Sequence, residues 1–503
     1  MLKSVLVANR GEIALRVLRA ARDLGIHAVA VYSEADRESP HVWEADEAHL
    51  IGPAPAAESY LVQEKLIRVA RDRGIEAIHP GYGFLAERAD FAQAVDDAGL
   101  IFVGPSADTI RAMGDKTEAR RRMMEAGVPV VPGTEAIETV SEAETEAARI
   151  GFPVILKASA GGGGKGMRVV QNVGEVGRAL EAAKREALAA FGDDKVYLER
   201  YLQRPRHIEV QLFGDQQGNV VHLGERECSI QRRHQKLVEE APSPVLTPDE
   251  RQRMGEAAVR AAQAVNYVGA GTVEFLYEDG EFFFLEMNTR LQVEHPVTEY
   301  VTGLDLVELQ FRIASGESLP FEQDDVALTG HAIECRITSE SPFDGFLPST
   351  GKVTELSVPT GPNVRWDGGV ARGSVIGLSY DPLLGKLIAF GSDRTAAIRR
   401  MERALGELTL AGVATCAPLL KRIMAEPDFN EGDLSIRYLE DHPDLLVPLT
   451  LEGDPSFPEE VALIDQVAVA AVLMEVEATR RSAPTRLAPV SHARTEWQRG
   501  LAP

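Results

Sequence analysis

Polar side chains recur at every second position in one stretch of the sequence, residues 281–296 (EFFFLEMNTRLQVEHP). They are Glu286, Asn288, Arg290, Gln292 and Glu294. If the stretch is extended, these side chains share one face, and the apolar side chains at positions 283, 285, 287, 291 and 293 share the other. Carboxylate and amide oxygens bind Mg²⁺, and a guanidinium matches a small planar oxyanion. A half-buried edge strand would also alternate, but a polar face without Lys, Ser or Thr favours a cation site beside an anion site.

A second candidate site is the glycine-rich loop 160–166 (AGGGGKG), which lies between two β-branched runs. It satisfies GxGxxG, but no helix pattern follows, which excludes a Rossmann turn. Lys165 precedes its glycine and no Ser or Thr comes next, which excludes a Walker A loop. Strand, loop and strand then predict a hairpin whose bare amides fold over phosphates, with Lys157 in the leading strand. A flexible surface hairpin is the alternative, although Lys157, Lys165 and Arg168 around four consecutive glycines favour an anion.

The third candidate is the polar and basic run 227–236 (ECSIQRRHQK), where an acidic chain collects cations. Such a run is usually a solvated face or an ion-pair partner, here for Glu239 and Glu240. A strand at 271–276 adds one carboxylate, Glu274, just upstream of the 281–296 stretch.

The elements that must position these residues follow an α/β pattern. Strands at 4–8, 27–32, 76–79 and 100–104 alternate with helices at 12–24, 60–73 and 91–98, which predicts a parallel sheet. The Gly-rich turn 79–84 follows a strand, where open α/β sheets place ligands. Pro and Gly at 127–133 predict the start of an inserted lobe. Further strands are predicted at 196–202, 207–213 and 220–225.

Composition limits the partners. The net charge of −24 disfavours nucleic acid and anionic membranes as partners, since both recruit clustered Lys and Arg. The apolar N-terminal run is too short for a secretory signal, and the longest uncharged apolar run, 467–474, is too short to span a bilayer. The distant Cys228, Cys335 and Cys416 predict reduced thiols in a cytoplasmic protein.

Taken together, the motifs resemble those of the ATP-grasp superfamily and, within it, biotin carboxylase, over about residues 1–446. The resemblance is carried by the glycine-rich loop 160–166, called the flap below, by Glu274, by the stretch 286–296 and by seven shorter motifs in the family's order. These are 9–14 (NRGEIA), 79–84 (HPGYGF), 114–116 (GDK), 206–209 (RHIE), 232–236 (RRHQK), 334–336 (ECR) and 380–386 (YDPLLGK). The sequence departs from the family's pattern at 376–379, which affects the expected subunit contacts, and at Cys416. Neither departure affects the predicted chemistry.

The resemblance implies a division of the chain into four parts. They are an N-terminal parallel-sheet domain at 1–113, an ATP-grasp domain at 114–330 with a flap lobe at about 131–203, a C-terminal α+β domain at 331–446, and a helical, partly disordered extension at 447–503. The apolar segment 461–474 in that extension either packs on the enzyme or docks a partner.

The resemblance also implies the reaction: ATP and bicarbonate give carboxyphosphate, and the carboxyl group moves to biotin. Lys116, Lys157 and the flap residues Gly163, Gly164, Lys165 and Gly166 would bind phosphates. The adenine would meet Glu199, Arg200, Tyr201 and Leu202, and the nucleotide would also contact His207, Gln231 and His234. Mg²⁺ or Mn²⁺ would bind Glu274, Glu286 and Asn288. Bicarbonate would bind Lys236, Arg290, Gln292 and the Val293 amide, with Glu294 as the base. Arg336 would stabilise the biotin oxyanion.

No biotinyl-lysine Met-Lys-Met motif occurs in the sequence, so the resemblance implies biotin on a separate carboxyl carrier protein. The other expected partners are a carboxyltransferase and a second copy of the chain in a homodimer. The expected role is the first half-reaction of an acyl-CoA carboxylase, such as the acetyl-CoA carboxylase of fatty acid biosynthesis. The alternatives are a pyruvate carboxylase subunit, another ATP-grasp ligase, or a nucleotide-sensing scaffold without catalysis.

Overall fold

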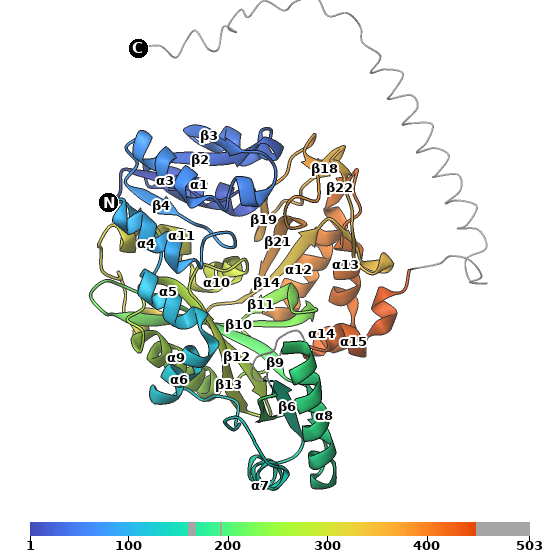
Figure 1. The fold of residues 1–503 in the computed structure, drawn as a ribbon. Helices are drawn as coiled ribbons and strands as arrows, with labels where there is room; N and C mark the ends of the chain where they lie inside the picture. The colour runs from blue at the N-terminus through green and yellow to red at the C-terminus, as the bar shows by residue number, and fades with distance from the viewer. Residues whose placement is uncertain (159–166, 192–193, 449–503) are drawn as a thin grey trace, which may run out of the picture. The chain divides into compact units, whose positions relative to one another are not determined.

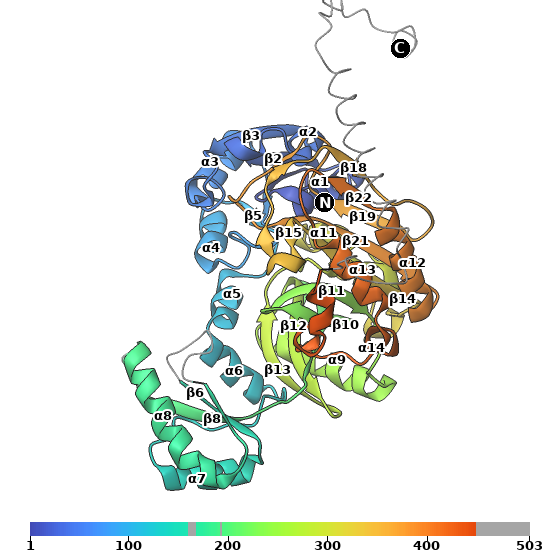
Figure 2. The ribbon, with the colours of Figure 1, turned by 90° about the vertical axis from the view of Figure 1, so that its right-hand side faces the viewer.

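The computed structural model describes residues 1–158, 167–191 and 194–448. Residues 1–446 form one compact unit, and the predicted α/β fold class is confirmed for it (Figures 1 and 2). The predicted flap loop and the predicted helical extension from 449 onward lie outside the described residues. In the part of the chain that is described, no helix combines the length and the apolar character that crossing a membrane needs.

The N-terminal part contains the predicted parallel sheet, in the order β3-β2-β1-β4-β5. Its strands are β1 Ser4–Val7, β2 His27–Ser33, β3 Glu47–Gly52, β4 Ala77–His79 and β5 Ile101–Phe102. The helices around it are α1 Gly11–Asp23, α2 Pro40–Glu44, α3 Gln63–Asp72, α4 Ala89–Asp97 and α5 Ala107–Gly114. The helix expected from Tyr60 begins three residues later, because the Tyr60 ring is buried and its hydroxyl donates to Asp36 at 2.6 Å.

The site is built on an antiparallel sheet of eight strands, in the order β13-β12-β9-β10-β11-β14-β21-β19. Its strands are β9 Arg206–Gly214, β10 Val220–Arg232, β11 Gln235–Ala241, β12 Gly269–Glu278, β13 Glu281–Asn288, β14 His331–Thr338, β19 Val364–Gly368 and β21 Leu383–Gly391. The pairing of β11 with β14 carries this sheet across residue 330, where the sequence predicts a domain boundary. Arg336 therefore lies on the strand next to Lys236, although one hundred residues separate them in sequence.

Helices pack against this sheet. In the middle of the chain these are α6 Lys116–Glu125, α9 Pro248–Gln263, α10 His295–Thr302 and α11 Leu306–Ala314. The C-terminal helices are α12 Arg394–Glu407, α13 Ala417–Ala425, α14 Pro427–Glu431 and α15 Tyr438–Asp441. Of these helices, α9 and α10 pack on the central strands of the sheet, and α12 packs on β14 and β21. Short strands complete this part: β15 Glu340–Ser341, β16 Leu347–Pro348, β17 Gly351–Lys352, β18 Glu355–Ser357, β20 Val375–Ile376 and β22 Thr409–Ala411. One apolar cluster joins α12 and α13 to β11, β14 and β21, which fixes the strands that carry the site.

The flap lobe is a separate three-stranded sheet, β7-β6-β8, at the bottom of Figures 1 and 2. It consists of β6 Val154–Ala158, β7 Arg168–Val170, β8 Val196–Arg200, and the helices α7 Val140–Ile150 and α8 Val173–Phe191. β6 pairs antiparallel with both neighbours, so Lys157 lies in the central strand, directly opposite Tyr197.

The expectation of one extended stretch over 281–296 is wrong. β13 ends at Asn288 and α10 begins at His295, so the intervening residues form a loop. Within β13, Glu286 pairs with Glu274 but Phe284 pairs with Phe275, which leaves Leu285 as a bulge residue. Leu285, expected in the core, is accordingly 45% exposed. In the loop, Leu291, Gln292 and Glu294 are all buried, because a loop does not impose the two-residue alternation of a strand.

Candidate active site

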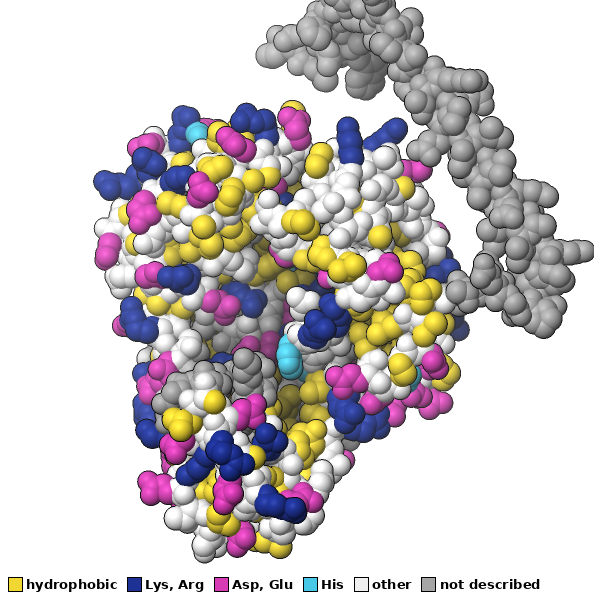
Figure 3. All heavy atoms as spheres, turned by 45° about the vertical axis from the view of Figure 1, so that its right-hand side comes forward, with side chains coloured by type: hydrophobic (Ala, Val, Ile, Leu, Met, Phe, Trp, Pro, Cys, Tyr) yellow, Lys and Arg dark blue, Asp and Glu magenta, His cyan; other side chains and the backbone are white. Residues whose placement is uncertain are grey.

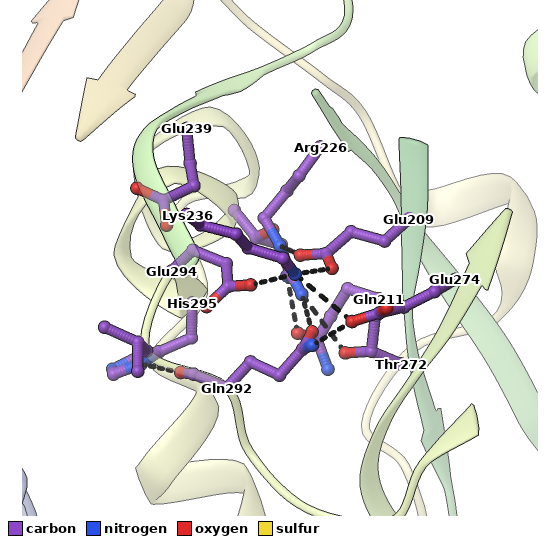
Figure 4. Close-up of polar contacts among 12 residues, drawn as sticks. Glu209, Gln211, Arg226, Lys236, Glu239, Thr272, Glu274, Gln292, Glu294 and His295 are labelled. Carbon is purple, nitrogen blue, oxygen red and sulfur yellow. Dashed lines mark hydrogen bonds and ion pairs between the residues drawn. The ribbon is translucent and has the colours of Figure 1, made fainter. Parts of the chain in front are cut away.

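Acidic side chains from two strands and one loop converge on a single ammonium group (Figure 4). Nζ of Lys236 lies 2.5 Å from Glu209 Oε2, 2.6 Å from Glu294 Oε1 and 3.2 Å from Glu274 Oε1. Strand register brings this about, since Glu209 on β9 lies directly opposite Glu274 on β12. The structure thus brings together three predicted site residues, Lys236, Glu274 and Glu294. Figure 3 shows one face of the molecule hollowed near its centre, with charged side chains around the margin.

Glu274 is the second centre of the cluster. Its Oε1 accepts hydrogen bonds from Asn288 Nδ2 at 3.0 Å and Gln292 Nε2 at 2.8 Å, and its Oε2 lies 3.0 Å from His207 Nε2. Burial alone would raise the pKa of Glu274, but the interactions with Lys236 and then with His207 outweigh it and hold this pKa far below its usual value. Glu274 is therefore ionised at neutral pH.

Glu294 lies between two cations from adjacent strands. Oε1 of Glu294 accepts from Lys236 of β11, and Oε2 accepts from the Arg336 guanidinium of β14 at 2.9 Å. Arg336 also donates to Glu239 Oε1 at 2.5 Å. Burial opposes the charge of Glu294, yet Lys236 and Arg336 hold its pKa well below the usual range. The two cations keep this buried carboxylate ionised. If a second anion binds the same cations, its negative charge favours protonation of the carboxylate, which can then accept a proton.

Arg226 was not selected from the sequence. It is fully buried and forms hydrogen bonds with several residues of the cluster (Figure 4). It donates to Glu209 Oε1 at 2.6 Å and to Gln292 Oε1 at 2.7 Å. It also contacts Gln211, Thr298 and Thr272. Because Arg226 takes the oxygen of the Gln292 amide, the nitrogen of that amide faces Glu274.

Arg226→Met should destabilise the protein by about 3–5 kcal/mol, because it removes a buried partner from the Glu209 carboxylate. The comparison is Arg253→Met, which breaks an exposed ion pair with Asp249 and should change stability by less than about 0.5 kcal/mol. The urea midpoint of unfolding measures both variants. Equal midpoints for the two would show that the Arg226 network does not stabilise the fold.

Arg290 is held on the other side of Asn288. Its Nε donates to Glu87 at 2.8 Å and its Nη2 donates to Asn288 Oδ1 at 2.7 Å. Arg290 thus reaches the cluster through Asn288, whose amide nitrogen bonds Glu274. Glu87, from the turn before α4, is another contact that the sequence did not predict.

The predicted nucleotide residues lie at the flap lobe, on α6, on β9 and along the hairpin of β10 and β11. Lys157 Nζ lies 2.5 Å from Glu199 Oε2, and Arg200 lies 2.5 Å from Glu281. Tyr201 and Leu202 follow β8, and Lys116 is exposed at the start of α6. Gln231 is buried on β10, whereas His234 is exposed in the hairpin turn. Gly163, Gly164, Lys165 and Gly166 lie outside the described residues.

The predicted metal ligands Glu274 and Glu286 lie directly opposite each other on β12 and β13. Two facing carboxylates suit a divalent cation, and Glu286 is exposed, which leaves that side open to solvent. The amide of Asn288 presents its nitrogen, not its oxygen, to Glu274. His207, Glu209 and Glu274 also place ligand atoms within 4.8 Å of one another, but Lys236 already bonds both glutamates.

Comparisons with known proteins identify the family of the chain. Family models match three consecutive parts of the chain: the biotin carboxylase N-terminal domain at 1–110, the carbamoyl-phosphate synthase L chain ATP-binding domain at 115–322, and the biotin carboxylase C-terminal domain at 334–441. Biotin carboxylase of Haemophilus influenzae is 52% identical over 442 residues, which cover 88% of this chain and 98% of that protein. One of the pyruvate carboxylase subunits of Methanothermobacter thermautotrophicus is 53% identical over 443 residues, covering 88% and 90%.

A solved structure is similar over the same region. The biotin carboxylase domain dimer of Hydrogenobacter thermophilus 2-oxoglutarate carboxylase, in complex with MgADP, ADP and bicarbonate, has a TM-score of 0.79 and 48% identity. The match covers 90% of this chain and 100% of that one. On these matches, the chain belongs to the biotin carboxylase family of ATP-grasp ligases.

Proposed function

We propose that this enzyme carboxylates biotin on a separate carrier protein, with ATP and bicarbonate as substrates, as the first half-reaction of an acyl-CoA carboxylase. Biotin carboxylase activity follows from the family. The observation that supports the residue roles is the position of Glu294, with Lys236 at 2.6 Å on one oxygen and Arg336 at 2.9 Å on the other.

In this proposal Glu294 is the base that removes the proton of bicarbonate. Bicarbonate would share Lys236 with Glu294, and a second anion beside a carboxylate raises the proton affinity of that carboxylate. Arg290, Gln292 and the Val293 amide would complete the pocket. Arg336 would then leave Glu294 for the ureido oxygen of biotin as negative charge develops there.

The nucleotide would lie between the flap lobe and the sheet. Lys116, Lys157 and the flap would bind its phosphates, and residues 199–202 with His207, Gln231 and His234 would complete the pocket. Glu274 and Glu286, with Asn288, would hold Mg²⁺ or Mn²⁺. A bound cation would neutralise the phosphate oxygens during phosphoryl transfer.

The final acceptor and the partners extend the proposal. An acyl-CoA is the first candidate. Pyruvate is the second, because the Methanothermobacter relative is named as part of a pyruvate carboxylase. The partners would be a biotin carboxyl carrier protein, a carboxyltransferase and a second copy of the chain, since the Hydrogenobacter domain was solved as a dimer.

The direct test is ADP release by the purified full chain with free biotin. Release that requires bicarbonate and increases when biotin is added supports the proposal, whereas release that biotin does not change indicates another ATP-grasp ligase. Adding co-purified subunits with either acetyl-CoA or pyruvate then identifies the acceptor from the labelled product.

Deleting residues 451–503 should leave carboxylation of free biotin within about twofold, because a match of 442 residues already covers 98% of the Haemophilus enzyme. If that segment docks a partner, the deletion should abolish co-purification while kcat is kept. Loss of kcat together with a lower unfolding temperature would instead make the segment part of the enzyme core.

A further inference from the structure

Two buried donors hold the peptide groups on either side of Val293. His295 Nδ1 lies 2.8 Å from the Gln292 carbonyl oxygen, and the His295 amide donates to the same oxygen (Figure 4). Lys386 Nζ donates to the Val293 carbonyl oxygen at 2.6 Å. In a trans peptide the C=O and N–H point in opposite directions. Fixing the Gln292 carbonyl therefore fixes the direction of the Val293 N–H, and fixing the Val293 carbonyl fixes the backbone from which Glu294 extends.

Neither donor lies at the surface of the protein. Lys386 is fully buried on β21, and its ammonium lies 3.4 Å from Glu12 of the N-terminal helix α1. Three distant parts of the chain thus meet at one ammonium group: α1, β21 and the loop after β13. A buried ammonium loses its hydration, which destabilises the fold unless its contacts compensate.

His295 is also fully buried. Burial, and then the positive charge of Lys386, hold the pKa of His295 well below its usual value, so the ring is neutral. A carbonyl oxygen only accepts hydrogen bonds, so the single ring proton lies on Nδ1, which faces Gln292. Nε2, the other ring nitrogen, has no hydrogen-bond partner among the described residues. The ring thus makes its side-chain hydrogen bond to the Gln292 carbonyl.

We propose that Lys386 and His295 are positioning residues for the bicarbonate pocket: they fix the Val293 amide and the backbone of Glu294 without touching a substrate. The proposal rests on the proposed function, in which that amide and that carboxylate act on bicarbonate. Glu12 has the supporting role of placing the Lys386 ammonium. The carboxylate of Glu12 otherwise has no hydrogen bond in the described part of the chain.

The effect should fall on bicarbonate rather than on ATP. The predicted nucleotide contacts of the flap lobe, such as Lys157 with Glu199, involve neither Lys386 nor His295. A displacement of a substrate-positioning group by 1 Å costs up to about 100-fold, and here the cost should appear in the KM for bicarbonate. A loss confined to bicarbonate therefore separates positioning from a general weakening of the fold.

The test compares two amide replacements of one ring in the full-length enzyme. In His295→Asn the side-chain NH₂ can take the place of Nδ1–H, whereas in His295→Gln the amide lies near the position of Nε2. We expect His295→Gln to raise the KM for bicarbonate by about 10- to 100-fold, with the KM for ATP within twofold. His295→Asn should restore most of the affinity. Lys386→Met, of similar length but uncharged, should act like His295→Gln.

His331→Asn is the matched control, because His331 is also buried and bonds Glu240 at 2.6 Å on the same sheet. It should lower the unfolding temperature without changing the KM for bicarbonate. The proposal is overturned if both His295 variants keep the normal KM, if they are equally impaired, or if the KM for ATP rises in parallel. If Lys386→Met does not fold, the comparison of His295→Asn with His295→Gln alone tests the proposal.

Glu294→Gln, assayed in parallel, separates this inference from the proposed function. If Glu294→Gln loses turnover while His295→Gln and Lys386→Met keep the normal KM for bicarbonate, only the positioning roles are refuted. Full turnover in Glu294→Gln refutes the assignment of the base, and the positioning proposal fails with it.

Discussion

Glu294→Gln is expected to lower bicarbonate-dependent and biotin-dependent turnover by about 100-fold or more, the scale of a lost general base. The substitution keeps the size of the side chain but removes its ability to accept a proton. It also removes the negative charge between Lys236 and Arg336. ATP binding should change by less than about threefold, because the predicted adenine and flap contacts lie elsewhere. Steady-state ADP release and nucleotide titration measure the two quantities.

Glu240→Gln is the matched control for this experiment. Glu240 is the next residue after Glu239 on β11, is equally buried, and bonds His331 and Arg394 instead of the cluster. Its loss should lower stability while turnover stays within a few-fold. If Glu294→Gln keeps turnover within a few-fold, or if both variants lose it equally, Glu294 is not the base.

Local patterns in the sequence predicted the parts of this fold that depend on neighbouring residues. Each strand and helix of the βαβ alternation in the first hundred residues, and the polar types in 286–294, are visible in fewer than twenty consecutive residues. The bulge at Leu285 is not visible there, because it depends on how β13 pairs with β12. The expected core residues Phe283, Met287 and Leu291 are therefore buried, but Leu285 is exposed. The polar residues Asn288, Gln292 and Glu294 are buried as well.

The candidate site shows the same limit. Glu209 could have been selected, since His207, Glu209 and Gln211 place three polar groups on one face of an otherwise apolar strand. Arg226 could not, because Glu225, Arg226 and Glu227 are consecutive and give no face. Only the register of β9 with β10, which pairs Arg226 with Glu209, shows why this arginine is buried. The role of Lys386 could not be predicted either, because it depends on a hydrogen bond to Val293, 93 positions earlier.

Arg336→Ala is expected to impair the transfer of the carboxyl group to biotin more than the cleavage of ATP. The guanidinium of Arg336 lies beside Glu294 and Glu239, away from the predicted nucleotide contacts of the flap lobe. Its proposed charge partner, the ureido oxyanion, forms only in the second half-reaction. Removing an oxyanion donor lowers a rate by about 10²–10³-fold. We therefore expect carboxybiotin formation to fall by about 100-fold or more.

The ATP-cleavage step should lose less, on the order of tenfold, because Arg336 also helps to hold Glu294 ionised. Bicarbonate-dependent ADP release without biotin reports the first step, and labelled carboxybiotin reports the second. The rate of carboxybiotin formation by Arg336→Lys should lie between the rates of the unchanged enzyme and of Arg336→Ala. Lysine keeps the positive charge but lacks the forked guanidinium that can bond Glu239 and an oxyanion together. Equal losses in both assays for Arg336→Ala would mean that Arg336 acts only through Glu294, and its assignment to biotin would then be wrong.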